Sequence, residues 1–418
     1  MPLLVMKFGG TSVADLARIE NAAKKVKAEV ARGYDVIVIV SAMSGKTNEL
    51  VGWVEGTSKL YDAREYDAVV AAGENVTAGL MALRLQEIEV PARSWQGWQV
   101  PINTTSAHSS ARFVSIPRQN IDAKFAEGFK VAVVAGFQGV SAEGRITTLG
   151  RGGSDTTAVA FAAAFGAERC DIYTDVDGVY TTDPRIVQKA QRLSRVSYEE
   201  MLEMASLGAK VLQVRSVELA MVRGVRMFVR SSFEEPDAID STDGGDPPGT
   251  LICDEEEIVE KKVVSGIAYS KDEAQISLRR VADKPGVAAA VFGPLAAASI
   301  NVDMIVQNVS EDGTLTDMTF TVPTADYDRS RKVLEGARQA IGYEVLQGST
   351  DVAKVSVIGI GMRSHAGVAA DCFKALAGKG INIRAITTSE IKISVLIDAT
   401  YTELAVRTLH SLYGLDNT

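Results

Sequence analysis

Three segments in the first half of the chain place glycines beside charged side chains. In Lys7-Phe8-Gly9-Gly10-Thr11-Ser12, an apolar stretch runs into two glycines and then small hydroxyl residues. Such a turn exposes backbone N–H groups ahead of a helix N-terminus and suits a phosphate, to which Lys7 adds a mobile positive charge. A glycine pair also marks plain tight turns, so the lysine carries the inference. Neither G-x-x-x-x-G-K-[ST] nor G-x-G-x-x-G occurs in this domain, so the phosphate grip is of another kind.

The second segment is Thr148-Leu149-Gly150-Arg151-Gly152-Gly153-Ser154-Asp155, and an alanine-rich helical pattern follows it until Gly166. Ser154 or Asp155 is predicted to be the N-cap of that helix. The glycines leave Arg151 little to pack against, and a guanidinium binds a carboxylate through two parallel hydrogen bonds. Arg151 is therefore a candidate for an anionic ligand, and a simple capped helix start is the alternative.

The third segment runs from Tyr173 to Arg185 and contains Thr174-Asp175-Val176-Asp177-Gly178-Val179-Tyr180 and Asp183-Pro184-Arg185. It lies just beyond an expected strand, and ligands of open α/β sheets gather at the carboxyl ends of strands. Asp-Gly and Asp-Pro also mark ordinary turns, so composition alone leaves both interpretations open.

The elements that must position these segments alternate between short apolar runs and longer helical patterns. Strands are expected at 3–8, 35–40, 130–135 and 170–174, with a helix at 16–32. Near-continuous apolar runs such as 36–40 are typical of parallel strands covered on both faces. The pattern predicts an αβα sandwich with a mostly parallel sheet.

Composition narrows the class of partner. The 418 residues are 46% hydrophobic and 23% charged, with a net charge of −9 and a pI near 5.2. Nucleic acids and anionic membranes favour basic surfaces, so neither is expected, and the ligand is expected to be small. Three distant cysteines fit neither a disulfide framework nor a zinc site, and no run of eighteen apolar residues occurs. A cytoplasmic protein is predicted.

The last third of the chain holds an internal repeat. Gly286-Val287-Ala288 recurs as Gly367-Val368-Ala369, and Ile300-Asn301 recurs as Ile381-Asn382. Each copy predicts a strand, a glycine turn, an alanine-rich helix and two further strands. This βαββ pattern resembles the ACT domain, a ferredoxin-like module that binds small amino acids, and a duplicated packing unit without a ligand is the alternative.

The periodic pattern fails between 233 and 260, where Asp-Gly-Gly-Asp-Pro-Pro-Gly stands at 243–249. This composition predicts a domain boundary, with a surface loop as the alternative. The expected limits are a catalytic domain at 1–245, a linker at 246–262, a first ACT domain at 263–345 and a second at 346–418.

Taken together, these motifs resemble the monofunctional bacterial aspartate kinases of the amino acid kinase family over nearly the whole chain. The supporting motifs also include Ser41-Ala42-Met43-Ser44-Gly45-Lys46-Thr47 and Gly73-Glu74. The resemblance implies phosphoryl transfer from MgATP to the side-chain carboxylate of aspartate, the first step of lysine, threonine and methionine biosynthesis. Asn75 stands where the family commonly has glutamine.

The resemblance also implies the site residues. Lys7 and Asp155 are the catalytic pair. The nucleotide and its phosphates are assigned to Lys7, Gly9, Gly10, Ser41, Thr174, Asp175, Tyr180, Asp183, Arg185 and Lys210. Aspartate is assigned to Thr47, Glu74, Arg151, Gly152 and Ser154, and the charges of Arg151 and Glu74 suit the two ends of an amino acid. No residue is expected to bind a metal directly, because Mg²⁺ arrives with ATP.

Two matched turns in the repeat are the expected effector sites. By resemblance the effectors are lysine, threonine or both, and paired ACT domains imply a homodimer or a larger oligomer. The residues assigned to effectors are Asp283, Asn301, Asp303, Gln307, Asn308, Asn382 and Ile383. The carboxylate of Asp303 suits an effector's ammonium group.

The chemistry fits the absence of an obvious general base. A carboxylate with a reference pKa of about 3.9 is ionised at neutral pH and can attack phosphorus directly. The three histidines lie away from the motifs in sequence and are expected to be ordinary residues.

Three other functions compete with this one. Glutamate and acetylglutamate kinases are disfavoured by the tandem repeat. A regulatory protein with an inactive kinase domain is disfavoured by the retained motif residues, and a fusion to homoserine dehydrogenase is not expected at this length.

Overall fold

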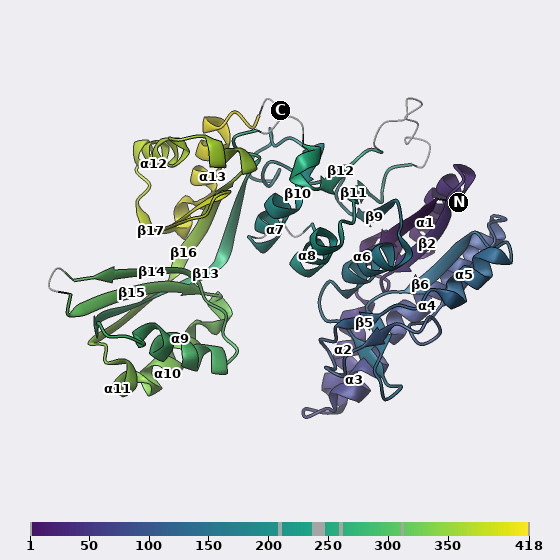
Figure 1. Ribbon diagram of the computed structural model, residues 1–418, viewed down its shortest axis with the longest axis horizontal. Helices are drawn as coiled ribbons and strands as arrows, with labels where there is room; N and C mark the ends of the chain where they lie inside the picture. The colour runs from purple at the N-terminus through teal and green to yellow at the C-terminus, as the bar shows by residue number, and fades with distance from the viewer. Residues whose placement is uncertain (1, 208–210, 236–246, 259–261, 311–312, 417–418) are drawn as a thin grey trace. The chain divides into compact units, whose positions relative to one another are not determined.

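The computed structural model describes residues 2–207, 211–235, 247–258, 262–310 and 313–416, which form two compact units (Figure 1). Unit 1 comprises the described residues of 2–179, 192–205 and 211–258. Unit 2 comprises 180–191, 206–207 and the described residues from 262 onward. The α/β class predicted from the sequence is confirmed.

Unit 1 is built on an eight-stranded sheet in the order β10-β12-β11-β9-β1-β2-β6-β3, in which only the β11–β12 pairing is antiparallel. Its strands are β1 (Leu3–Phe8), β2 (Asp35–Val40), β3 (Ala92–Trp95), β6 (Val131–Ala135), β9 (Arg169–Thr174), β10 (Arg195–Ser197), β11 (Met227–Ser231) and β12 (Thr250–Cys253). The expected strands at 3–8 and 35–40 match β1 and β2.

Helices cover both faces of this sheet because the strands are apolar on both sides. Leu4, Met6 and Phe8 of β1 share a core cluster with α1 and α4. Successive strand side chains point to opposite faces, so Lys7 points to the other layer, where α6 packs on β1 and α8 on α6. The helices are α1 (Leu16–Ala31), α2 (Lys46–Thr57), α3 (Ala63–Val70), α4 (Ala72–Glu87), α5 (Gln119–Ala126), α6 (Gly153–Phe165), α7 (Tyr198–Ser206) and α8 (Val214–Arg223).

A second, four-stranded sheet in unit 1 has the order β5-β4-β7-β8. Its strands are β4 (Asn103–Thr104), β5 (Phe113–Ser115), β7 (Gln138–Val140) and β8 (Ile146–Thr148). β7 begins shortly after β6, and β8 leads into the glycine-rich segment before α6. This small sheet therefore joins the main sheet to the Arg151 segment.

The segment expected to be a linker contains a core strand. Residues 250–253 fall within the expected linker at 246–262, yet they form β12, which is buried between β10 and β11. The Thr-Leu-Ile-Cys sequence is short and apolar, and the preceding turn composition obscured it. Residues 243–246 lie outside the described residues.

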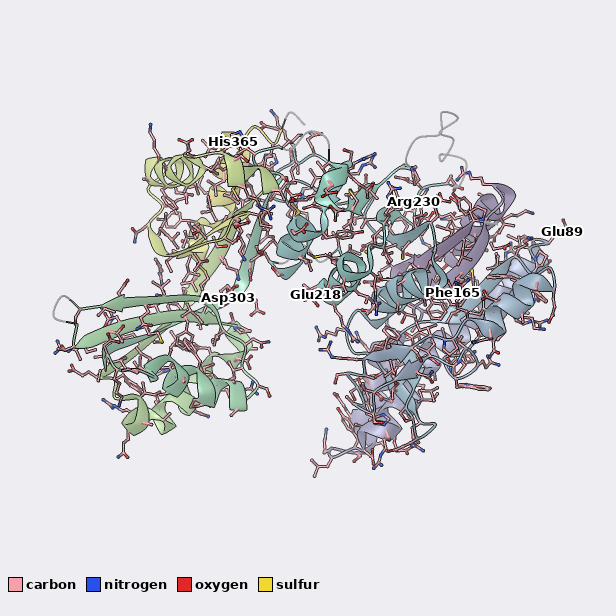
Figure 2. All side chains as sticks on the ribbon, in the orientation of Figure 1. Glu89, Phe165, Glu218, Arg230, Asp303 and His365 are labelled. Carbon is pink, nitrogen blue, oxygen red and sulfur yellow. The ribbon has the colours of Figure 1, made fainter. Side chains whose placement is uncertain are left out.

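A group of charged side chains from β9, β11 and α1 is buried together. Asp171 is fully buried and accepts hydrogen bonds from Arg230 Nη1 at 2.8 Å and from Arg169 Nε at 3.0 Å. Glu29 of α1 pairs with the same Arg169 at 3.2 Å. Figure 2 labels Arg230 on β11. Buried charges are costly without partners, so this network fixes α1, β9 and β11 to one another.

One helical stretch among the described residues, Ala63–Glu87, is long and apolar enough to cross a membrane. It comprises α3 and α4, and 44% of its most apolar part is buried. Ala78, Met81 and Leu85 belong to the core cluster between α1 and the sheet. The stretch therefore serves as part of the core of unit 1.

Unit 2 contains a six-stranded sheet in the order β14-β15-β13-β16-β18-β17. The strands are β13 (Gly266–Ala282), β14 (Asp303–Val309), β15 (Leu315–Val322), β16 (Val345–Ile358), β17 (Ile383–Thr388) and β18 (Lys392–Asp398). The helices are α9 (Val287–Ala297), α10 (Tyr327–Gly336), α11 (Arg338–Ile341), α12 (Val368–Gly378) and α13 (Thr402–Leu412). Each repeat contains the predicted strand, helix and two strands.

The two repeats share their longest strands. Residues 266–270 of β13 pair with 354–358 of β16, whereas 275–279 of β13 pair with 345–349 of β16. Ile267 therefore belongs to the core formed by α12 and α13, and Leu346 packs against the core formed by α9. The predicted limits at 345 and 346 divide a strand that serves both cores.

Residues 180–191 group with unit 2, although their motif begins on β9 of unit 1. Thr181 O accepts the Ile267 N–H at 2.7 Å, and Thr181 Oγ1 lies 2.9 Å from His410 Nε2. Asp183 Oδ2 accepts hydrogen bonds from Tyr269 OH at 3.1 Å and from Arg185 Nη2 at 2.8 Å. The third sequence motif therefore divides between the two units after Val179.

Candidate active site

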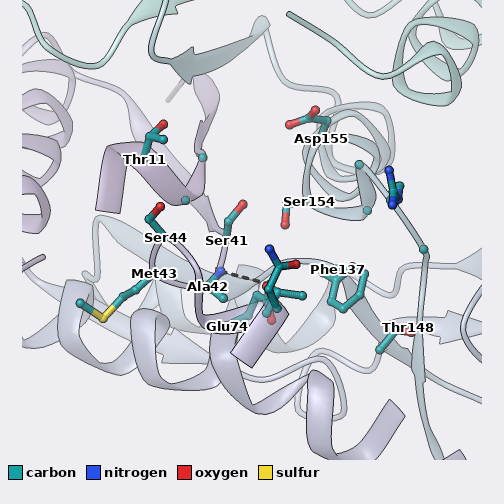
Figure 3. A pocket seen from close by; sticks show the side chains of 18 of the residues that line it. Thr11, Ser41, Ala42, Met43, Ser44, Glu74, Phe137, Thr148, Ser154 and Asp155 are labelled. Carbon is teal, nitrogen blue, oxygen red and sulfur yellow. Dashed lines mark hydrogen bonds between the residues drawn. The ribbon is translucent and has the colours of Figure 1, made fainter. Parts of the chain in front are cut away.

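A cavity of about 770 Å³ opens in unit 1 at the carboxyl ends of the parallel strands (Figure 3). The turns after β1, β2, β6 and β9 all contribute lining residues, as expected for an open α/β sheet. Figure 3 shows Ser41, Glu74, Ser154 and Asp155 around this cavity.

Lys7 and Asp155 form a nearly buried ion pair in the cavity wall. Lys7 Nζ lies 2.5 Å from Asp155 Oδ1, and each side chain is about one-tenth exposed. The strand period directs Lys7 toward α6, and Asp155 lies in the first turn of that helix. A lysine ammonium has three donors, so this contact orients Lys7 and leaves donors for a ligand.

The two glycines after Lys7 serve different purposes. The Gly9 N–H donates to Tyr173 O at 3.2 Å, so the expectation that this amide is available to phosphate is wrong for this conformation. A Cβ at Gly9 would lie 3.3 Å from Lys7 Nζ, and one at Gly10 would lie 3.1 Å from Ala42 O. Because neither glycine has a Cβ, the backbone can pass close to the Lys7 ammonium at Gly9 and to the Ala42 carbonyl at Gly10.

Glu74 is a buried carboxylate at the start of α4. Its Oε1 accepts the Ala42 N–H at 3.0 Å, whereas Oε2 is buried without a hydrogen-bond partner in the described part of the chain. Burial raises the pKa of Glu74 to about 7, and the Ala42 hydrogen bond opposes that shift. The unpartnered oxygen of this buried carboxyl group can accept a hydrogen bond from a ligand.

Asn75, which departs from the family pattern, has a structural partner. Its Oδ1 accepts a hydrogen bond from Gln138 Nε2 at 2.8 Å, and the same amide also donates to Ala71 O at 3.1 Å. The contact ties the start of α4 to β7. The shorter amide therefore supports the helix that carries Glu74.

Arg151 stands on the glycine-rich segment before α6. Its side chain is exposed, and among the described residues its guanidinium has neither an ion pair nor a hydrogen bond. Gly152 has φ +69°, and a Cβ there would lie 1.9 Å from Gln213 Cγ. The N-cap of α6 is Gly152, so the prediction of Ser154 or Asp155 as N-cap is wrong. Both residues instead lie in the first turn and face the cavity.

The structure brings most of the predicted residues to this cavity. They are Lys7, Gly9, Gly10, Ser41, Thr47, Glu74, Arg151, Gly152, Ser154, Asp155, Thr174 and Asp175. Tyr180, Asp183 and Arg185 are not among its lining residues, and they group with unit 2. Lys210 lies outside the described residues.

Sequence reasoning missed several lining residues, including Tyr66, Ser109 and Phe137. Each is an isolated residue outside the quoted motifs, and only the fold brings it to the cavity. Phe137 and Ser109 have φ values of +67° and +64°, which are uncommon for residues other than glycine. For Phe137, its place two residues after the apolar run of β6 was the available signal.

Six of the seven effector residues predicted in unit 2 lie on or beside the outer strands of its sheet, β14 and β17, and Asp283 follows the central strand β13. Asp303, Gln307 and Asn308 are on β14, and Ile383 begins β17. Asn301 lies just before β14, Asn382 just before β17, and Asp283 directly after β13. Asp303, labelled in Figure 2, already accepts a hydrogen bond at Oδ2 from Lys354 Nζ at 2.6 Å. An effector's ammonium group would have to share this carboxylate with Lys354.

Comparison with known proteins identifies the architecture. The model of the amino acid kinase family matches residues 2–231, and models of the ACT domain match 275–339 and 355–413. The chain belongs to the amino acid kinase family. Among the described residues of this amino acid kinase, no group of three or more His, Cys, Asp or Glu side chains is arranged to hold a metal ion.

Similar proteins cover the whole chain of this amino acid kinase. An aspartate kinase of Stutzerimonas stutzeri is 54% identical over 417 residues, spanning 100% of this chain and 98% of that protein. An aspartokinase of Pseudomonas aeruginosa is 53% identical over 418 residues, with the same coverage. E. coli aspartokinase III in complex with aspartate and ADP (R-state) is 27% identical with a TM-score of 0.78, covering 98% of this chain and 99% of that one.

Proposed function

We propose that this chain is an aspartate kinase, which transfers the γ-phosphoryl group of MgATP to the side-chain carboxylate of L-aspartate. The products are 4-phospho-L-aspartate and ADP. The observation that carries the proposal is one cavity whose lining residues include a lysine and glycine turn suited to phosphates, together with Glu74 and Arg151, whose opposite charges suit an amino acid. The curated relatives named above are aspartate kinases over the full length of the chain.

The phosphate end of the cavity rests on Lys7. Its ammonium neutralises charge that spreads over the phosphoryl oxygens during transfer, and Asp155 holds it in place at 2.5 Å. The amide of Gly10 and the hydroxyl of Ser41 bind the phosphates. The amide of Gly9 is left out of this set, because it already donates a hydrogen bond to Tyr173 O. Catalysis on this account is positioning and electrostatics.

The acceptor end reads both charges of aspartate. Glu74 presents its open oxygen to the substrate ammonium, and Arg151 binds a substrate carboxylate in two-point fashion. Thr47, Gly152 and Ser154 line the same cavity and supply polar contacts. The transferring carboxylate is already ionised, so no general base is needed.

The nucleotide end is assigned to Thr174 and Asp175, which line the cavity after β9. The further assignments to Tyr180, Asp183, Arg185 and Lys210 stay predictions. Mg²⁺ is held mainly by the phosphates of ATP, and a carboxylate of this wall such as Asp175 would add to its ligands. When bound with ATP, the ion supplies further positive charge to the phosphates.

Regulation by lysine, threonine or both is proposed for the two ACT domains. E. coli aspartokinase III, a structural neighbour with a TM-score of 0.76, has been solved in complex with lysine and aspartate (T-state). The candidate effector residues lie around β14 and β17, apart from Asp283 at the end of β13. We infer a cytoplasmic homodimer or larger oligomer formed through these domains. Sedimentation of the purified chain tests the oligomeric state.

A coupled assay of ADP release tests the activity with aspartate, with glutamate and without an acceptor. Release that depends on aspartate, together with hydroxamate formation when hydroxylamine traps the acyl phosphate, is the expected result. Equal release with glutamate would assign a different acceptor. Release without any acceptor, and no hydroxamate, would reject carboxylate phosphorylation.

A further inference from the structure

Asp67 of α3 is a fully buried carboxylate that contacts two segments of the cavity wall. Its Oδ1 accepts a hydrogen bond from Thr148 Oγ1 at 2.6 Å. The Ser109 N–H lies 3.1 Å from each of its oxygens, and His108 Nδ1 lies 2.7 Å from Oδ2. The carboxylate only accepts hydrogen bonds, so all of these groups act as donors.

The two segments that Asp67 joins touch each other in the wall. The Ala111 N–H donates to Thr148 O at 2.9 Å, and a Cβ added to Gly150 would lie 3.2 Å from Ser109 O. Ser109, Thr148, Gly150 and Arg151 all line the cavity. A shift of the Ser109 loop would therefore displace the backbone next to Arg151.

The Ser109 backbone needs an external constraint. Its φ of +64° lies in the left-handed region, which a serine adopts at a cost unless its surroundings impose it. Asp67 supplies that constraint by accepting the Ser109 N–H from a fully buried position. Arg151 has no side-chain partner of its own within the described residues, so the backbone on which it stands sets its position.

We propose that Asp67 is a positioning residue for the acceptor substrate: by holding Ser109 and Thr148 it fixes the backbone that presents Arg151 to the cavity. This inference rests on the proposed function, since it requires Arg151 to bind a carboxylate of aspartate. Two-point recognition of a carboxylate tolerates little displacement, so loosening this wall weakens acceptor binding. The nucleotide end, formed by the turns after β1 and β9, is unaffected.

A proton relay through Asp67 and His108 is the rival interpretation. It would require His108 to face the reacting groups, yet His108 is not among the lining residues of the cavity. The acceptor carboxylate also has no proton to lose at neutral pH. The pair therefore acts as part of the scaffold.

Steady-state kinetics of Asp67→Asn and Thr148→Val test the proposal. Asparagine keeps the size of the side chain and removes its charge, and valine deletes one donor. Both variants are expected to raise the KM for aspartate about tenfold and to leave the KM for ATP within about twofold. Amide hydrogen exchange at Ser109 should accelerate in both variants, which reports the loosening without an activity assay.

Glu200→Gln is the matched control. Glu200 is a buried carboxylate of unit 1 that accepts a backbone N–H and a hydroxyl from Ser197, each at 3.1 Å, and it lies outside the cavity wall. It should lower thermal stability without changing either KM. A variant of Asp67 that behaves in the same way, with a lower melting temperature and an unchanged aspartate KM, would overturn the positioning role.

Arg151→Ala separates this inference from the proposed function. If Arg151→Ala raises the aspartate KM and Asp67→Asn does not, only the role of Asp67 is rejected. If Arg151→Ala has no effect, the assignment of the acceptor site is rejected instead. With both assignments correct, the double variant should bind aspartate no more weakly than Arg151→Ala alone, because the two changes remove one interaction. Additive losses would show that Asp67 acts elsewhere.

Discussion

Lys7 Nζ lies 2.5 Å from Asp155 Oδ1, so a nearly buried ion pair joins the end of β1 to the first turn of α6. The two residues are distant in sequence and meet because the strand period turns Lys7 toward that helix. The pair places one positive charge where the strand ends meet the cavity.

Lys7→Ala should lower kcat about 10²- to 10³-fold and change the KM for ATP much less, because the charge that Lys7 offsets develops during transfer. Lys46→Ala is the matched control, since Lys46 pairs with Glu49 at 2.6 Å and is not among the lining residues. Steady-state kinetics measure both. A kcat for Lys7→Ala within about threefold of the parent would contradict the role.

Aspartate binding should depend on pH through Glu74. The pKa of about 7 means that Glu74 loses its charge as the pH falls below 7, so kcat/KM for aspartate at pH 6 should be about tenfold below its plateau near pH 8. The pH dependence of kcat/KM reflects the ionisation of Glu74 in the free enzyme. It should disappear in Glu74→Gln, in which kcat/KM should be low at every pH. A flat profile in the parent would exclude Glu74 as the partner of the ammonium group.

The same carboxyl should also affect stability. Its folded pKa of about 7 lies above the ordinary value of 4.5, so the folded state holds the proton more tightly than the unfolded chain. Its contribution is present below pH 4.5 and is lost as the pH rises to about 7. Glu74→Gln should therefore gain stability relative to the parent between pH 5 and pH 8, by chemical denaturation. If the difference in unfolding free energy between Glu74→Gln and the parent stayed the same from pH 5 to pH 8, burial would not be raising the pKa of Glu74.

Arg151→Ala should raise the KM for aspartate and leave that for ATP unchanged, and Arg151→Lys should rescue it poorly, because an ammonium group lacks the two-point geometry of a guanidinium. Arg145→Ala serves as the control, since Arg145 pairs with Glu65 away from the lining residues. If Arg151→Lys kept the parent's KM for aspartate, position 151 would need only a positive charge and not the geometry of a guanidinium. An increase confined to the ATP KM would move Arg151 to the nucleotide.

Asp303→Ala should relieve inhibition by lysine or threonine if the Asp303 carboxylate binds the effector's ammonium. Lys354 Nζ, buried between Asp303 at 2.6 Å and Glu273 at 2.8 Å, is the internal competitor for that carboxylate. Glu273→Gln removes the other partner of Lys354 and leaves Asp303 intact. Equal relief in both variants would implicate the Lys354 pairing rather than effector contact, and unchanged inhibition in Asp303→Ala would exclude this site.

Patterns within short stretches of sequence were enough to predict the strands and turns that those stretches form. Continuous apolar runs gave β1 and β2 at their observed bounds, and the glycine segments marked the positions of Lys7 and Arg151. Contacts between residues distant in sequence could not be predicted from such patterns, because they depend on how the elements pack. Asp67 looks like any acidic residue of a helix, and only the fold brings Thr148 and Ser109 to it. The strand β12 was missed because it is four residues long and follows a turn-rich stretch.

The sharing of β13 and β16 makes the two ACT repeats one cooperative unit of unfolding. Opening of the second repeat would strip residues 266–270 of their strand partner and expose Ile267, while 275–279 would remain tied to the first repeat through the same continuous strand. Neither repeat can therefore be excised or exchanged as an independent module. Its cut ends would be unpaired strand edges, which are prone to aggregate.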